Sequence, residues 1–158
     1  MINVIKEQQG NILVVRIVGS VEENVNFEQV VGPCPPANSE MHVNCKGVTR
    51  INSVGVKSWI RYFQNIKAKG VNLKFVECST TIVEQLNFIS NFNCGGEIIS
   101  IYVPFSCDKC HTELVGLFKA DVLKKLKYKV PPLKCSKCGG QAVFDDVPEE
   151  YFAFMMAT

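Results

Sequence analysis

The stretch VNCKGVTRINSVGV, residues 43–56, decides the fold of this chain, because it contains a strand, a loop and the start of a long helix. After it, apolar residues recur with the three- and four-residue spacing of one buried helix face: Val56, Trp59, Ile60, Phe63 and Ile66. Asn52 and Ser53 supply capping side chains at the start of this helix, and Gly70 ends it. We therefore expect a strand followed by a helix, with Trp59 and Phe63 in the core.

Strand and helix patterns alternate on both sides of this stretch. In chain order we expect strands at residues 2–6, 12–18 and 41–45, a short helix within 24–31, the long helix, a strand at 71–76, a helix with a Thr81–Glu84 capping box, and a strand at 98–103. Strands that alternate with helices favour parallel pairing. The sequence therefore predicts an α/β fold with a mixed, mostly parallel sheet and packed helices.

Length and composition limit the classes of protein that need to be considered. The chain has 158 residues, of which 47% are hydrophobic and 20% charged, and this composition argues against wholesale disorder. It lacks an apolar run of 18 residues, and its N-terminus lacks the basic start and apolar run of a signal peptide. We therefore expect a cytoplasmic protein without a membrane span.

Two cysteine pairs mark a change of character after residue 105. Cys107 and Cys110 form one CxxC pair, and Cys135 and Cys138 form another after 24 intervening residues. A two-residue gap lets both sulfurs of a pair reach one ion, and two such pairs give the tetrahedral four-sulfur shell of a structural Zn²⁺. We expect an α/β domain at residues 1–105 and a zinc-ribbon module at residues 106–158.

Other interpretations of these cysteines remain open at this stage. The same four sulfurs would also suit a rubredoxin-like iron site, and free thiols or two redox-active pairs would have the same spacing. His111 lies beside Cys110 and could replace one ligand. A catalytic zinc is disfavoured because four cysteines leave no open coordination position.

The cysteine-rich segment is also rich in lysine. Residues 106–140 contain eight lysines and three acids, although the whole chain has a net charge of only +2. Within residues 119–137, basic and aromatic side chains are mixed, as at a surface that contacts nucleic acid. A solvated surface without a ligand has the same composition.

The elements up to residue 103, together with the turn Asn52-Ser53-Val54-Gly55, resemble the STAS family, which includes bacterial anti-sigma factor antagonists. Members of that family have a hydrophobic strand, an Asp-Ser-x-Gly-like turn and then a long helix. In the antagonists, the serine of this turn is phosphorylated by a partner kinase that is also the anti-sigma factor, and phosphorylation breaks their complex. The resemblance implies Ser53 as the acceptor, although this chain has Asn52 where phosphorylated members usually have Asp.

No enzyme motif accompanies these features: the sequence has no Gly-rich phosphate loop, nucleophile elbow or metalloprotease motif. The resemblance implies a non-enzymatic bacterial regulatory protein that acts through protein–protein contact, with an anti-sigma kinase or related regulator as partner. Ser53 could also be a helix cap without modification. The alternatives are a nucleic-acid-binding zinc-ribbon protein with the α/β part as scaffold, and a small-ligand sensor, since some STAS domains bind small molecules.

Overall fold

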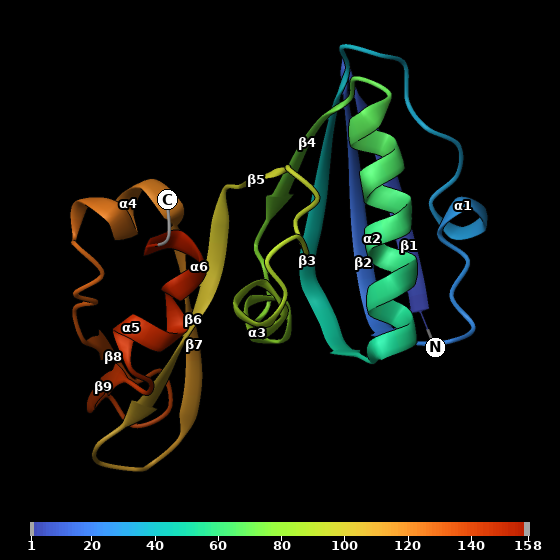
Figure 1. The fold of residues 1–158 in the computed structure, drawn as a ribbon. Coiled ribbons are helices and arrows are strands. Elements are labelled where there is room, and N and C mark those ends of the chain that lie inside the picture. Colours follow the sequence, from blue (N-terminus) through green and yellow to red (C-terminus); the bar gives the residue numbers. More distant parts are fainter. Residues whose placement is uncertain (1, 157–158) are drawn as a thin grey trace.

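The first sheet occupies the N-terminal part of the computed structural model, which describes residues 2–156 (Figure 1). Its strands follow the order of the chain: β1 (Ile2–Gln9), β2 (Ile12–Val21), β3 (Glu40–Ile51), β4 (Asn72–Val76) and β5 (Glu97–Ile98). β1 is antiparallel to β2, and every later pair in this sheet is parallel. The predicted mixed, mostly parallel α/β sheet is therefore confirmed.

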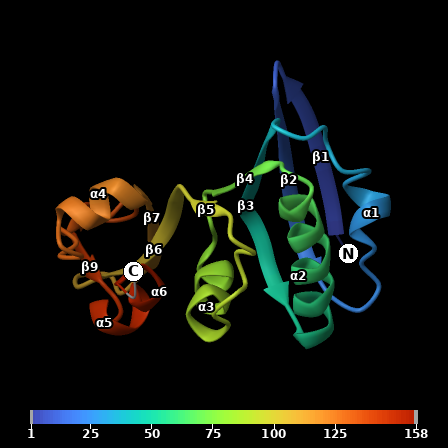
Figure 2. The ribbon, with the colours of Figure 1, turned by 45° about the horizontal axis from the view of Figure 1, so that its top comes forward.

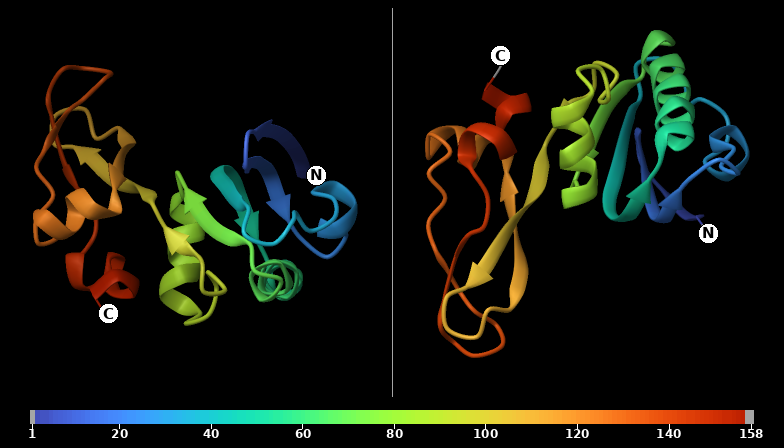
Figure 3. Two further views of the ribbon diagram at one scale, coloured as in Figure 1. Left: turned by 90° about the horizontal axis from the view of Figure 1, so that it is seen from above. Right: turned by 60° about the horizontal axis from the view of Figure 1, so that its bottom comes forward.

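The helices α1 (Phe27–Val30), α2 (Ser53–Ala68) and α3 (Thr80–Phe88) connect these strands. α2 and α3 cover the same face of the sheet (Figure 3, left). Trp59 and Phe63 of α2 are fully buried there, as predicted. The Trp59 ring stacks on Phe92 with centroids 5.0 Å apart, and its indole N–H donates to the Phe92 carbonyl at 3.2 Å. Aromatic packing therefore forms the centre of the first core.

A second, antiparallel sheet follows, with strand order β7-β6-β9-β8. Its elements are β6 (Ser100–Cys107), β7 (Glu113–Lys119), α4 (Ala120–Lys125), β8 (Leu133–Lys134), β9 (Gln141–Phe144), α5 (Pro148–Tyr151) and α6 (Ala153–Met156). This part lies beyond α3, on the side away from α1 (Figures 1 and 2). Among residues 2–156, no helix has the length and apolar content needed to cross a membrane.

The two sheets meet at Ile99. Its N–H donates to the Phe75 carbonyl in β4, and its own carbonyl accepts from the Ala120 N–H of α4, both at 2.8 Å. The strand predicted at residues 98–103 is therefore two strands in different sheets. The change of sheet also lies earlier than the boundary predicted at residue 105.

Two further local predictions were wrong. The strand predicted at residues 41–45 continues to Ile51, because Gly47 is not in a loop but packs against β2, where a Cβ would lie 2.8 Å from Val18 Cγ2. Helix α3 is capped by Ser79, whose hydroxyl accepts from the Ile82 N–H, and not by the predicted Thr81 capping box. The Thr81 hydroxyl instead donates to the Thr49 carbonyl at 3.1 Å.

The C-terminal helices connect the second sheet to the first part. Tyr151 and Phe152 are buried, and the Phe152 ring stacks on Phe144 with centroids 5.5 Å apart. The Asn87 side chain at the end of α3 donates to the Tyr151 carbonyl and accepts from the Phe154 N–H. Buried side chains of both parts consequently belong to one continuous cluster.

Candidate metal centre

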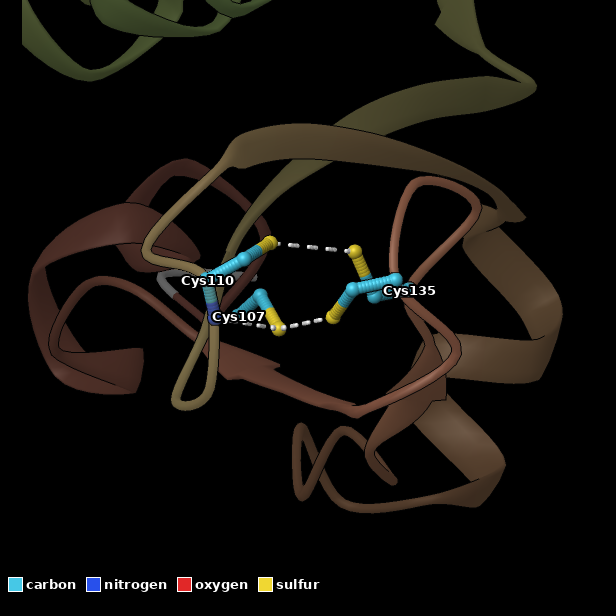
Figure 4. A group of neighbouring side chains, drawn as sticks. Cys107, Cys110 and Cys135 are labelled. Atoms are coloured by element: carbon cyan, nitrogen blue, oxygen red, sulfur yellow. Dashed lines mark hydrogen bonds between the residues drawn. The ribbon is translucent and has the colours of Figure 1, made fainter.

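The structure brings together the sulfurs of all four cysteines singled out in the sequence (Figure 4). Cys107 ends β6, and Cys110 lies in the turn that follows; Cys135 follows β8, and Cys138 lies in the turn before β9. All four Sγ atoms lie within 4.8 Å of one another. Strand pairing of β6 with β9 and of β9 with β8 sets the two turns side by side.

The spacing of the sulfurs fits a tetrahedral metal ion. Cys107 Sγ lies 3.5 Å from Cys138 Sγ, and Cys110 Sγ lies 3.7 Å from Cys135 Sγ. Four sulfurs at a Zn–S distance of about 2.3 Å lie about 3.8 Å apart at the corners of a tetrahedron. The donor set and its size therefore suit Zn²⁺, and they also suit iron in a four-sulfur site.

Backbone N–H groups point at the sulfurs in both turns. The N–H groups of Lys109 and Cys110 each donate to Cys107 Sγ at 3.4 Å, and the Gly140 N–H donates to Cys138 Sγ at 3.3 Å. Such bonds stabilise the thiolate form that binds metal. The turns thus place partial positive charge next to the ligand atoms.

Gly139 and Gly140 make the second turn possible, each for a different reason. Gly139 has a φ of +77°, which favours glycine. A Cβ on Gly140 would lie 3.0 Å from Lys109 Cβ, 3.2 Å from Cys138 Sγ and 3.3 Å from Cys107 Sγ. The absence of a side chain at Gly140 therefore allows the two turns to approach each other around the sulfurs.

The four thiols have unequal proton affinities. Hydrogen bonding from Thr112 lowers the pKa of Cys110 to about 6, and the backbone N–H of Cys110 lowers the pKa of Cys107. At Cys138 the Gly140 N–H acts in the same direction, but the sulfurs of Cys107 and Cys110 raise the pKa to about 11. Cys107 and Cys110 are thus easily deprotonated, whereas Cys138 is not. This difference is expected where several thiolates would lie close together, because each negative charge disfavours the next.

The surroundings argue against two of the other interpretations. A redox-active CxxC pair normally begins a helix, whereas Cys107 and Cys135 are each followed by a turn. His111 is exposed and is not part of the four-sulfur group. Cys45, Cys78 and Cys94 are buried elsewhere, and Cys34 is partly exposed.

Ser53, the predicted phosphorylation site, is the first residue of α2 and is exposed. The cap of this helix is Asn52, whose side chain accepts from the Gly55 N–H at 2.8 Å. Ser53 itself makes no side-chain hydrogen bond with any residue between 2 and 156. Its hydroxyl is therefore not needed as the cap.

Sequence reasoning missed a carboxylate beside this helix start. Glu23 lies in the loop after β2, and its carboxylate accepts from the Asn52 side-chain amide at 2.6 Å. This hydrogen bond lowers the pKa of Glu23. Asn52 is neutral, whereas an Asp at this position would carry a negative charge. Glu23 places a negative charge beside Asn52.

Gly55 explains the glycine of the Asn52–Gly55 turn. A Cβ at this position would lie only 2.0 Å from the Val21 carbonyl oxygen, so no other residue fits without moving the backbone. The first turn of α2 therefore rests directly on the end of β2.

The lysines of the second part are exposed to solvent. In the described part of the chain, none of them is within ion-pair range of an acidic group. The exposed lysines between residues 119 and 137 are Lys119, Lys124, Lys125, Lys127, Lys129, Lys134 and Lys137. These lysines lie in the same module as the four cysteines.

Comparison with models of known protein families finds no match, and comparison with curated proteins finds no relative.

Proposed function

We propose that the four-sulfur centre holds a structural Zn²⁺ ion. The observation that carries this proposal is the gathering of Cys107, Cys110, Cys135 and Cys138 at tetrahedral spacing, with N–H groups directed at Cys107 and Cys138. Four thiolates close the coordination shell, so the ion would hold the two turns together and would not activate water or substrate. The free state of all eight cysteines fits a reducing compartment, and we propose the cytoplasm.

Metal analysis of the purified protein tests this proposal. We expect one zinc per chain by inductively coupled plasma mass spectrometry, and none in a Cys107→Ser/Cys138→Ser variant. A Cys45→Ser variant, which removes a buried thiol outside the centre, serves as the control and should keep its zinc. A red protein with iron in place of zinc after growth in zinc-replete medium would contradict the proposal.

We further propose that the protein is a non-enzymatic regulator that binds another protein through the surface around Ser53. Three features support this proposal: the strand order with one antiparallel edge, the STAS-like turn before the long helix, and the exposed, unbonded Ser53 at the start of that helix. By the STAS resemblance, the partner would be an anti-sigma kinase or a related bacterial regulator.

Phosphorylation of Ser53 would change this surface in a defined way. A phosphate carries about two negative charges and is stabilised by the positive end of a helix dipole. Here it would also lie near the Glu23 carboxylate, which is hydrogen-bonded to the neighbouring Asn52. Repulsion between the two anions would weaken the Asn52–Glu23 bond and release the loop after β2, so that a partner would meet a changed surface.

A phosphorylation assay tests the switch. Incubation with ATP and lysate of the native host, followed by mass spectrometry, should detect one phosphate on wild type and none on Ser53→Ala. A Ser58→Ala variant changes a second serine of the same helix and should behave as wild type. Equal phosphate on wild type and Ser53→Ala would contradict the proposal.

A second function, nucleic-acid binding, is favoured by the exposed, unpaired lysines of residues 119–137. Such a surface would bind through phosphate contacts, and its affinity would fall steeply with salt. Fluorescence anisotropy with labelled single- and double-stranded DNA and RNA distinguishes the two functions. Binding that weakens in a Lys124→Ala/Lys125→Ala/Lys127→Ala variant would support nucleic-acid binding, whereas negligible binding at low salt would exclude this function.

A further inference from the structure

β7 is an edge strand whose outer side has no partner among residues 2–156. It is the first strand in the order β7-β6-β9-β8. Its neighbour β6 is occupied on its other edge, where it pairs with β9 and, through Ile101, with Cys78 between β4 and α3. The free edge of β7 therefore faces away from the rest of its own sheet. Unpaired edges of this length are templates for another strand.

The hydrogen bonds of β6 identify the backbone groups on this free edge. Just beyond the two ends of β7, the Cys107 N–H donates to the Thr112 carbonyl, and the Ala120 N–H donates to the Ile99 carbonyl. Backbone directions alternate along a strand, so the N–H and C=O groups of the even-numbered residues of β7 point at β6. The N–H and C=O groups of β6 that point away from β7 belong to its even-numbered residues. The Ser100 carbonyl accepts from the Cys78 N–H, and the Tyr102 N–H donates to the Cys78 carbonyl. In an antiparallel pair these directions alternate. The free backbone groups of β7 are therefore the N–H and C=O groups of Glu113, Val115 and Leu117, and the N–H of Lys119. The Lys119 carbonyl is not free, because Lys119 is the N-cap of α4 and its carbonyl accepts the first hydrogen bond of that helix.

The side chains of these same residues are exposed. Val115 is 52% exposed and Leu117 is 49% exposed, and they lie on one face of β7 with Glu113 and Lys119 at its ends. Residues 114, 116 and 118 point to the other face, where a Cβ on Gly116 would lie 2.8 Å from Leu133 Cδ1. β7 thus combines free backbone groups with an exposed apolar pair.

The sequence of β7, ELVGLFK, is complementary to itself when it is read in the opposite direction about Gly116. In an antiparallel pair centred on Gly116, Glu113 lies opposite Lys119, and Val115 lies opposite Leu117. Both ends of the pair would therefore join opposite charges, and its middle would join apolar side chains. Gly116 would lie opposite itself in a non-hydrogen-bonded pair, where the Cα atoms approach to about 4.5 Å.

We propose that β7 pairs with β7 of a second copy of this chain, to form a two-fold symmetric dimer with one continuous sheet across both C-terminal modules. The arrangement is closed, because each copy offers the same strand and no free edge of β7 is left. The free groups of Val115 and Leu117 would be hydrogen-bonded across the axis, and the Lys119 N–H would donate to the Glu113 carbonyl of the second copy. Charge complementarity favours a second copy over an unrelated peptide, because the acidic and basic ends match only in the antiparallel, self-paired register.

Molar mass as a function of concentration tests the dimer. Size-exclusion chromatography with light scattering on the zinc-loaded full chain should show twice the 17.6 kDa mass of one chain at high concentration and dissociation on dilution. A wild type that remains monomeric up to its solubility limit overturns the proposal. Growth into larger oligomers or fibres also overturns it, because a closed two-fold pair stops at two chains.

Charge reversal locates the interface. Glu113→Lys places lysine opposite lysine at both ends of the pair, and we expect the dissociation constant to rise by about tenfold. The double variant Glu113→Lys/Lys119→Glu restores opposite charges and should return the constant to near the wild-type value. Glu7→Lys makes the same charge change on β1, the edge strand of the first sheet, and should leave the constant unchanged. No rescue by the double variant would assign the dimer to another surface.

A proline variant tests the backbone bonds directly. Leu117→Pro removes an N–H that faces the free edge, and proline is tolerated at such edge positions because the ladder to β6 keeps its bonds. We expect a monomer with wild-type zinc content and circular dichroism. A folded, zinc-loaded Leu117→Pro variant that still dimerises with wild-type affinity would exclude β7 pairing.

Discussion

The two sheets of this protein are stabilised by different means. The first buries a cluster of large aromatic side chains under α2, with Trp59, Phe63 and Phe75 almost fully buried. The second buries fewer aromatic side chains: Phe105 stacks on Phe118 within the sheet, and Phe152 stacks on the half-buried Phe144 near α3. Its far end, around the cysteine turns, has two exposed cysteines and short strands such as β8.

The difference shows where a metal can take the place of a hydrophobic core. A small sheet with one open face cannot bury enough apolar surface to offset the loss of chain entropy. Four sulfurs around one ion fix two turns with strong bonds and need little buried area. If the two regions are stabilised separately in this way, a change in one should leave the other intact.

Zinc removal should have the largest effect. Metal binding contributes on the order of 10 kcal/mol to the folding of such sites, so a chelator should remove hydrogen-exchange protection from residues 106–144. Trp59, the single tryptophan of the chain, reports on the first core, and its fluorescence should not change. If Trp59 emission shifted in the same transition, the two regions would form one cooperative unit.

Phe63→Ala should destabilise the first region and leave the zinc-binding region intact. Loss of a fully buried phenylalanine costs about 3–5 kcal/mol, so the Trp59 fluorescence transition in urea should move to lower denaturant. Bound zinc, measured on the folded protein, should stay at the wild-type level. Phe152→Ala, a matched truncation in the second region, should instead loosen the packing beside Phe144. A loss of zinc from Phe63→Ala would contradict the separate stabilisation of the two regions.

Gly140→Ala should weaken zinc binding without unfolding the first sheet. Its Cβ would press on Cys138 Sγ, Cys107 Sγ and Lys109 Cβ, and we expect roughly tenfold lower zinc affinity in competition with a chromophoric chelator, equivalent to about 1.4 kcal/mol. Gly10→Ala is the control, because Gly10 lies in the turn between β1 and β2 and has open space around its Cβ position. Equal zinc affinity of Gly140→Ala and wild type would show that the turns can adjust.

The smallest effect concerns Glu23 and Asn52. Because the folded-state pKa of Glu23 is lowered, its contribution to stability is present above its ordinary pKa of 4.5 and is lost as the pH falls through the folded-state value. Asn52→Ala removes the hydrogen bond, so the Glu23 pKa measured by NMR should rise towards the ordinary value. The variant also removes the helix cap, at a cost of about 1 kcal/mol. An unchanged Glu23 pKa would show that Asn52 is not its main partner.

The sequence predicted those features that depend on local spacing. Helix α2 was recognisable because Trp59, Phe63 and Ile66 repeat at helical intervals, and the cysteine cluster was recognisable because each pair has a two-residue gap. Both patterns follow from geometry within one turn of chain. The mostly parallel sheet followed from the alternation of such local elements.

Features that depend on distant residues could not be predicted. The run of residues 98–103 is apolar except for Ser100 and contains neither glycine nor proline, so no turn signal marks the change of sheet at Ile99. Glu23 and Asn52 are 29 residues apart, and their contact depends on where β2 ends relative to α2. Gly47 was assigned to a loop because glycine often ends a strand. Its close packing against Val18, which requires glycine inside β3, is visible only in the structure.

The backbone of Ile99 makes chain length critical at the junction. Its N–H is committed to β4 and its carbonyl to α4, so the C-terminal module cannot turn like a domain on a flexible linker. Insertion of a single residue after Ile99 would exchange the two faces of β6, because side chains alternate along a strand. Val103 and Phe105 would then point to solvent, and Cys107 would point away from its three partner sulfurs. A one-residue change of length, with every side chain kept, would thus be enough to separate the two regions.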